Sequence, residues 1–191
     1  MMLLDEVKSL RDLITSLFAE GKFEEGMRKL GESRQLPRVV ELECMGNMHF
    51  YKREMQMAVE KYESAISLDP DYMISRYQYL VGTQDEKRGD LVAAFKRYQA
   101  AIGIEPSFVD AYVELGGMLV KVGDFKGAAQ CYRDAAKLSP TDLAVFHNLK
   151  SVLTRLKNEA PDQYGDELAM VEAAYVQLER GGASLPSNSK W

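Results

Sequence analysis

The chain has 191 residues, of which 46% are hydrophobic and 28% are charged, enough for a buried core beneath a polar surface. Its formal net charge of -5 disfavours a role in coating nucleic acid, which needs a clustered Lys/Arg surface. No stretch approaches the ~20 apolar residues that cross a bilayer, so we expect no membrane insertion.

The N-terminus does not resemble a secretory signal. Residues 1–4 are apolar, but Asp5, Glu6 and Lys8 follow at once, before a long enough apolar run can form. The two cysteines, Cys44 and Cys131, are far apart in sequence and are predicted to be thiols rather than a disulfide or metal ligands. We therefore expect a cytoplasmic protein.

Residues 1–36 predict a pair of helices. Apolar residues recur at helical spacing in the first half: Leu10, Leu13, Ile14 and Leu17. Gly21-Lys22-Phe23 predicts a turn, and a second helix is expected to run to about residue 34.

Residues 37–70 and 71–106 predict two further helix pairs, each with a departure. In the first, Arg53-Glu54 stands where later turns have Gly-Asp, so we expect that turn to be made differently. In the second, two residues are extra, and Asp85 takes the place of a large apolar residue. We expect its first helix to be longer or shifted in register.

Residues 107–140 give the clearest helix pair. Gly123 predicts the end of the first helix, because the residue after a last turn often needs a positive φ. The carboxylate of Asp124 is expected to cap the second helix by accepting a hydrogen bond from a free backbone N–H group at the start of that helix. Pro140 cannot continue that helix and predicts its end.

These segments are copies of one another. A shift of 34 residues places Gly82, Gly89 and Asp90 on Gly116, Gly123 and Asp124. A shift of 36 residues places the preceding copy on the middle one in the same order. The columns that recur include Ala94 on Ala128, Tyr98 on Tyr132, Ala101 on Ala135 and Pro106 on Pro140.

The pattern resembles the tetratricopeptide repeat family, whose unit is a helix–turn–helix of ~34 residues. The resemblance implies an all-α fold, a right-handed solenoid of about ten helices. It implies a degenerate pair at 1–36, repeats at 37–70, 71–106 (with a two-residue insertion) and 107–140, and a degenerate capping pair at 141–180. The Gly/Ser-rich residues 181–191 are predicted to be a disordered tail.

The sequence predicts no catalytic, metal or cofactor site. The two histidines, His49 and His147, lie nearly three repeats apart and should not meet, because each repeat touches only its neighbours. Metalloprotease, phosphate-loop and Ser-nucleophile motifs are all missing from the sequence.

In the family, the first helix of each repeat lines a concave groove, which implies a protein or peptide partner. Large apolar groups with acidic neighbours favour a partner segment that is both apolar and basic. The alternative is that the protein's own first helix or tail covers these groups. The predicted groove residues are Phe18, Glu43, Asn47, Phe50, Tyr51, Arg76, Tyr79, Asp110, Val113, Glu114, Val120 and His147.

Two functions fit this surface. The first is an adaptor or targeting chaperone that holds an extended or helical segment. A clamp for heat-shock chaperone tails is disfavoured, because Asn47 matches it but Glu43, Leu80, Asp110 and Glu114 occupy the other columns. The second is a self-assembling scaffold, a homo-oligomer in which a neighbouring copy receives Leu3, Leu4, Leu10 and Phe18.

Overall fold

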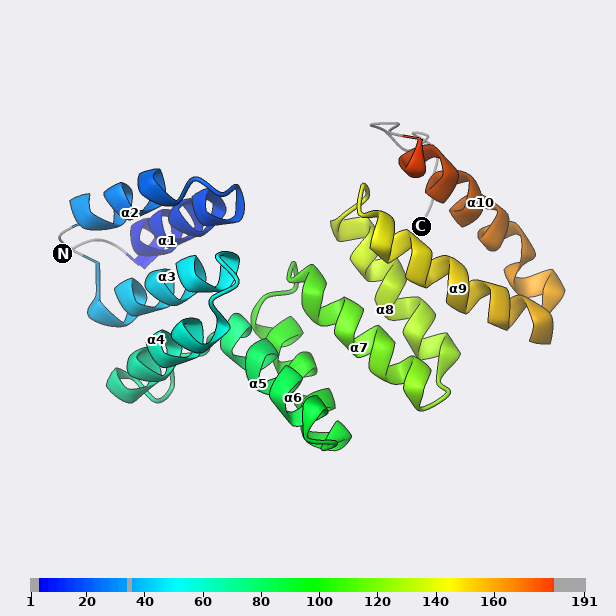
Figure 1. The fold of residues 1–191 in the computed structure, drawn as a ribbon, viewed down its shortest axis with the longest axis horizontal. Coiled ribbons are helices and arrows are strands. Elements are labelled where there is room, and N and C mark those ends of the chain that lie inside the picture. The colour runs from blue at the N-terminus through cyan, green and yellow to red at the C-terminus, as the bar shows by residue number, and fades with distance from the viewer. Residues whose placement is uncertain (1–3, 34–35, 181–191) are drawn as a thin grey trace. The chain divides into compact units, whose positions relative to one another are not determined.

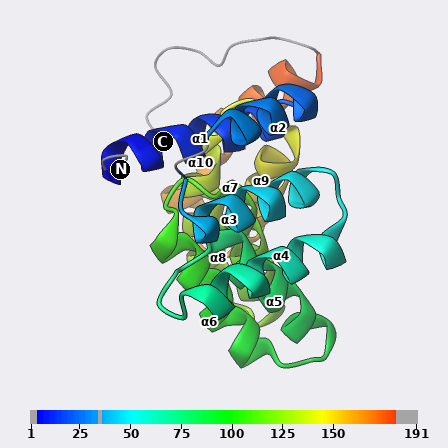
Figure 2. The ribbon, with the colours of Figure 1, turned by 90° about the vertical axis from the view of Figure 1, so that its left-hand side faces the viewer.

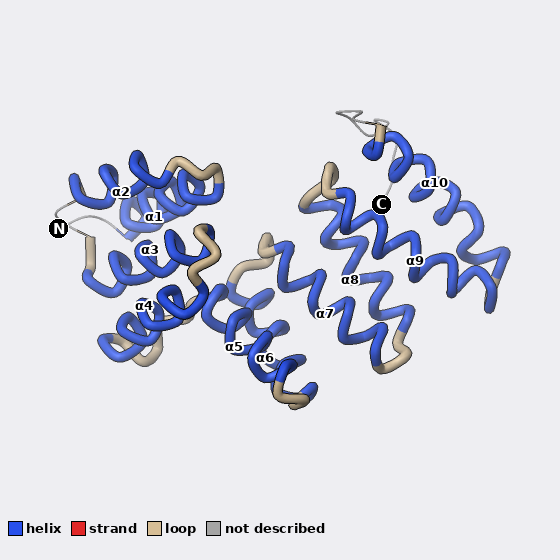
Figure 3. Tube along the Cα trace, viewed as in Figure 1, coloured by secondary structure: helices blue, strands red, loops and turns tan. Residues whose placement is uncertain are grey.

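The computed structural model describes residues 4–33 and 36–180, and within these ranges it contains ten helices and no strand (Figure 3). Helices hold 82% of the described residues, which confirms the predicted all-α class and helix number. The tail predicted at 181–191 lies outside the described residues, as does Leu3.

The chain divides into two compact units, Met1–Gln84 and Asp85–Trp191, with the boundary inside α5. The first contains α1 (Leu4–Ala19), α2 (Phe23–Glu32), α3 (Arg38–Tyr51), α4 (Met55–Leu68) and most of α5 (Ser75–Lys87). The second contains α6 (Leu91–Ile104), α7 (Val109–Lys121), α8 (Phe125–Leu138), α9 (Leu143–Glu159) and α10 (Pro161–Glu179).

Each unit is built from antiparallel helix pairs joined by short turns (Figure 1). In the first unit, α3 packs between α1 and α4, and the turned view shows these three helices in layers (Figure 2). In the second, α7 packs on α8 and α9 on α10, and α8 also packs on α9. In the second unit, α8 is thus covered both by its own partner, α7, and by the next first helix, α9.

Glycines let the two helices of a pair approach closely. A Cβ on Gly116 would lie 2.7 Å from a ring carbon of Tyr132, far inside normal contact. Gly46 has the same relationship to Tyr62. In the first pair the roles are exchanged, because the ring is Phe18 on the first helix and the glycine is Gly26 on the second.

The turn at Arg53-Glu54 differs from the prediction. Its backbone makes the same turn as the others: the N–H of Glu54 donates to the carbonyl of His49 at 2.9 Å, as Asp124 does to Leu119. Arg53 adopts a φ of 64°, within the left-handed region that Gly123 occupies with 82°. The expectation of a different turn was therefore wrong.

The capping residues after these turns do differ. Asp124 accepts from the backbone N–H of Gly127 at 2.9 Å, as predicted, and Asp90 accepts from Ala93 at 3.0 Å. Glu54 caps nothing, and its Oε2 lies 2.6 Å from Nδ1 of His49 instead. The carboxylate of Glu54 thus pairs with His49 instead of capping the start of α4.

The two extra residues of the middle copy do not lengthen its first helix. Helix α5 has 13 residues, the same as α7. The addition falls in the connection between α4 and α5, where Ile74 is buried and the hydroxyl of Tyr72 donates to Glu43 on α3. The prediction of a longer helix was wrong, because an insertion costs less in a loop than in a packed helix.

Both cysteines are free thiols, Cys44 buried and Cys131 half-buried. Burial raises the pKa of the Cys44 thiol to about 12, with a further increase from the Glu43 carboxylate. None of the described helices is long and apolar enough to cross a membrane.

Candidate interaction surfaces

Five residues of the predicted groove are buried in the first unit. Their exposed fractions are 0% for Phe18, 7% for Glu43, 1% for Asn47, 4% for Phe50 and 6% for Arg76. The sequence predicted that they line a groove, but the structure buries their side chains. The neighbouring first helices and the large side chains around these five residues cover them from solvent.

Asn47 illustrates this packing. Its Nδ2 donates to Oγ1 of Thr15 on α1 at 3.1 Å, and its Oδ1 accepts from the hydroxyl of Tyr62 on α4 at 2.8 Å. One amide therefore connects three helices at the centre of the first unit. Asn47 is a structural residue here, because both of its ends are engaged by the protein itself.

Glu43 belongs to a second polar cluster. Its Oε2 accepts from the hydroxyl of Tyr72 at 2.6 Å and lies 3.8 Å from Nη1 of Arg11. Burial raises the pKa of Tyr72, and the Glu43 charge raises it further. Sequence reasoning missed Arg11 and Tyr72, because the first lies in a degenerate repeat and the second in the insertion, where no repeat column assigns a role.

Arg76 holds the aromatic residues of α3 and α5 in place. Its Nη2 donates to the Tyr51 hydroxyl at 2.9 Å, and its guanidinium carbon lies 5.4 Å from the Tyr51 ring centroid and 5.9 Å from that of Phe50. Phe50 in turn makes edge contacts with Tyr51 and Tyr79, with ring centroids 5.5 and 6.0 Å apart.

This aromatic cluster, Phe50, Tyr51, Arg76 and Tyr79, is partly open to solvent. Phe50 and Arg76 are buried, whereas Tyr51 and Tyr79 are half-buried. The buried pair therefore forms a floor and the two tyrosines form the accessible layer. Such a fixed aromatic surface can contact a partner with little loss of side-chain freedom.

The predicted groove residues of the second unit are more exposed than those of the first. Val113, Glu114 and Val120 on α7 are half-buried, and Asp110 at its start is exposed. The two valines pack at the margin of the core formed by α8, α9 and α10. This side of α7 is therefore an accessible apolar strip with acidic residues beside it.

Two further groups of contacts lie in the second unit. Oε1 of Glu86 on α5 pairs with Nζ of Lys121, and Oε2 accepts from the hydroxyl of Tyr98 at 2.9 Å. On α9, the exposed His147 lies 5.9 Å from Tyr175, ring centroid to ring centroid. The ammonium of Lys150 stands 3.9 Å above the same ring. Lys150 and Tyr175 were missed, since the last pair departs from the repeat pattern.

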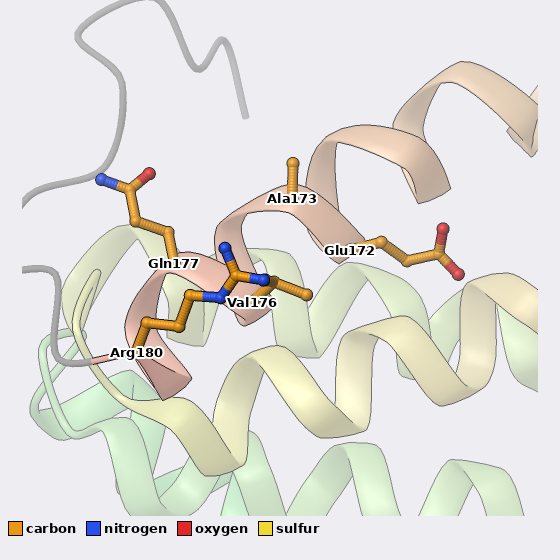
Figure 4. Close-up of a pocket in the computed structure, with 5 residues that line it drawn as sticks. All are labelled: Glu172, Ala173, Val176, Gln177 and Arg180. Carbon is orange, nitrogen blue, oxygen red and sulfur yellow. The ribbon is translucent and has the colours of Figure 1, made fainter.

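A shallow hollow lies on the surface of α10 (Figure 4). Val176, one of its lining residues, is 40% exposed, and Met170 on the preceding turns is 41% exposed. Glu172 and Arg180 supply charges at its rim. The described residues that line it are Glu172, Ala173, Val176, Gln177 and Arg180. No group of three or more His, Cys, Asp or Glu within the described ranges could hold a metal ion.

The family model for tetratricopeptide repeats matches residues 109–142. This is the copy in which Gly116, Gly123, Asp124 and Tyr132 have the contacts described above, and its neighbours repeat them. Residues 109–142 are thus a tetratricopeptide repeat, and the neighbouring helix pairs repeat its pattern. This repeat carries the coarse statement of function, since tetratricopeptide repeats are modules for protein–protein interaction.

Curated relatives match over part of their length. The Mus musculus protein O-mannosyl-transferase TMTC1 is 29% identical over 113 residues, which are 56% of this chain and 12% of the relative. The Trypanosoma brucei brucei serine/threonine-protein phosphatase T is 30% identical over 99 residues, 52% of this chain and 20% of the relative. The chain thus spans only a small part of these proteins.

Solved structures of MamA resemble the whole chain. One superposes with a TM-score of 0.54 at 18% identity, covering 88% of this chain and 95% of that one. Another, MamA residues 41 to the end from Desulfovibrio magneticus RS-1, gives 0.50 at 21% identity and covers 96% and 100%. At this identity the likeness shows the fold, that of a tetratricopeptide repeat solenoid.

Proposed function

We propose that this protein is an adaptor or targeting chaperone that holds an extended or helical segment of another polypeptide against its first helices. The observation that carries the proposal is the aromatic cluster. Tyr51 and Tyr79 are accessible, while Phe50 and Arg76 beneath them fix their orientation. Aromatic side chains that are already ordered are typical anchors of binding energy.

The second surface of the proposal is the α7 strip, Val113, Val120 and their acidic neighbours. A partner that places aliphatic side chains on the valines gains from the burial of apolar area, at roughly 25 cal/mol per Å². Asp110 and Glu114 favour Lys or Arg beside those side chains. The partner class is therefore an apolar segment with basic residues, and His147 lies on the next first helix of the same unit.

The buried groove residues act indirectly in this proposal. Glu43, Asn47, Phe50 and Arg76 position α1, α3 and α5 rather than touch a partner. Their replacement is expected to weaken binding only together with stability.

Affinity capture of partners by the native protein, followed by their identification, tests the proposal. Partners that depend on the two surfaces must be lost from a Tyr51→Ala/Tyr79→Ala variant or from a Val113→Asp variant whose helix content is unchanged. A Met57→Ala variant serves as the control, because Met57 is 47% exposed on the second helix α4. Retention of every partner by both surface variants would contradict the proposal.

The alternative function is a self-assembling scaffold. Leu4 and Leu13 on α1 are 83% and 47% exposed and could meet another copy. Phe18 cannot take the predicted part, because its ring is fully buried against Gly26. Light scattering at several protein concentrations separates the two functions, and a mass that stays monomeric throughout would remove the scaffold.

A further inference from the structure

The open face of α9 carries positive charge, although the net charge of the chain is negative. The buried side of this helix packs on α8 and α10. On the open side, Arg155 and Lys157 are exposed and Lys150 is half-buried. The one acidic residue of the helix is Glu159, at its last position. Positive charge is therefore in excess on this face.

Aromatic rings of the neighbouring helices hold two of these cations in place. Nζ of Lys150 stands 3.9 Å from the ring centroid of Tyr175 on α10. The guanidinium carbon of Arg155 lies 4.7 Å from the ring centroid of Phe125 on α8. A ring attracts a cation but carries no net charge, so the positive charge stays available to an anion. The two cations thus lie at opposite sides of the open face, toward α10 and toward α8.

Other cations of the second unit pair with carboxylates instead. Nε of Arg133 lies 2.6 Å from Oε1 of Glu167, and Nζ of Lys137 lies 3.0 Å from Oδ1 of Asp134. Within residues 4–33 and 36–180, the three cations of α9 form no such pair. A carboxylate of a partner can therefore approach them without competing with one from these residues.

Small polar side chains lie between the cations. The helical period places the exposed Ser151 and Thr154 between Lys150 and Arg155 on the open face. Oγ1 of Thr154 donates to the carbonyl of Lys150 at 2.8 Å, which holds this side chain close to the helix. An extended segment can therefore lie along α9 with cations on both sides of it.

We propose that the open face of α9 binds a short acidic segment of another polypeptide, with carboxylates on Arg155 at one side and on Lys150 and Lys157 at the other. The rise from Lys150 to Lys157 is about 10 Å, which three or four extended residues span. Two or three Asp or Glu side chains thus suffice to meet the three cations. This partner class differs from the apolar and basic segment proposed above, so either proposal can fail without the other.

The charge of the protein favours a polypeptide over a nucleic acid. A surface that binds DNA neutralises many phosphates at once, on the order of 6–10. The open face of α9 offers three permanent cations, in a chain of net charge -5. A few carboxylates complement such a face better than a long polyanion does.

Fluorescence anisotropy of a labelled peptide of alternating Glu and Ser, titrated with the full chain at low salt, tests the proposal. The parent protein should bind this peptide, and a peptide with Gln in place of Glu should not bind. Lys150→Glu/Arg155→Glu should weaken binding by roughly tenfold or more, because each reversal turns an attraction into a repulsion. The matched control, Lys96→Glu/Lys137→Glu, changes the net charge equally at two exposed lysines of α6 and α8 and should bind as the parent does.

Arg155→Glu/Lys157→Glu repeats the test with the contact between Lys150 and Tyr175 intact, so a folding defect of the first variant would not decide the outcome. Absence of binding by the parent protein would overturn the proposal, as would binding by both α9 variants that equals that of the parent. A thymidine oligonucleotide that binds the parent more tightly than the peptide, and is lost from the same variants, would assign the face to nucleic acid instead. A loss of molecular mass in these variants, measured by light scattering, would assign it to a second copy. Either result would also overturn the proposal.

Discussion

The ring of Tyr62 occupies the space that a side chain at Gly46 would need, and its hydroxyl donates to Oδ1 of Asn47 at 2.8 Å. The ring is fully buried and held at its far end by that bond. It therefore has little freedom to move away from α3. Close approach of the helices and satisfaction of a buried amide depend on the same side chain.

Gly46→Ala is therefore expected to destabilise the protein by about 1–3 kcal/mol, the usual range for overpacking a filled core. Gly165→Ala on α10 is the control. No heavy atom outside its own helix backbone lies within 4 Å of a Cβ at that position. Since alanine is the better helix former by roughly 0.5–1 kcal/mol, the control should gain stability. Urea unfolding of both variants checks the pair, and equal effects would show that Tyr62 can move aside.

Arg53→Gly should raise the free energy of unfolding by roughly 1 kcal/mol, because the left-handed backbone at this turn disfavours any residue with a Cβ. Gly123→Ala at the equivalent turn should lower it by a similar amount. Arg53 is exposed with a φ of 64°, so little packing is lost in the first variant. Thermal and urea melts measure both changes, and a destabilised Arg53→Gly protein would contradict the assignment of strain.

Glu86 predicts a dependence of stability on pH. Partial burial alone would raise the pKa of its carboxyl, but hydrogen bonds from Lys121 and Tyr98 outweigh burial and lower the pKa below its ordinary value. A carboxyl with a lowered pKa in the folded state stabilises the protein at neutral pH. This contribution fades as pH falls below the ordinary value of about 4.3 and through the lowered pKa of the folded state.

Glu86→Gln should therefore be less stable than the parent protein near pH 7, by up to about 1 kcal/mol for a pair of this exposure. The difference should shrink as the pH is lowered through the acid range. Urea melts of both proteins across pH values measure it. A difference that stays constant with pH would mean that the charge of Glu86 does not contribute.

The repeat architecture could be predicted from the sequence because each position that recurs from copy to copy makes a packing contact within its own repeat. Gly123 and Asp124 each have a role that depends on neighbours within one repeat, and both predictions are confirmed. The turn at Arg53 was predicted wrongly because residue type alone does not fix φ, and the remaining bonds of the turn are strong enough to impose it.

The exposure of the groove could not be predicted in the same way. A repeat column gives the direction of a side chain around its helix, but burial also depends on the size of its neighbours. Phe50 on α3 is buried under Tyr51 and Tyr79, whereas Val120 in the same column of α7 stays half-open. The bonds of Tyr72 and Arg11 to Glu43 lie between segments that share no pattern, so only the structure reveals them.

The affinity of a captured partner segment for Tyr79→Ala and Tyr51→Ala variants tests the central claim most directly. The account predicts a loss of about 1–3 kcal/mol of binding free energy for each, as for aromatic anchors in other interfaces. Helix content should remain close to the parent value in both, although Tyr51→Ala also removes the acceptor of buried Arg76 and should lower the urea midpoint. Met57→Ala should bind as the parent does. Unchanged affinity in both tyrosine variants would contradict the account, because the aromatic cluster would then have no part in binding.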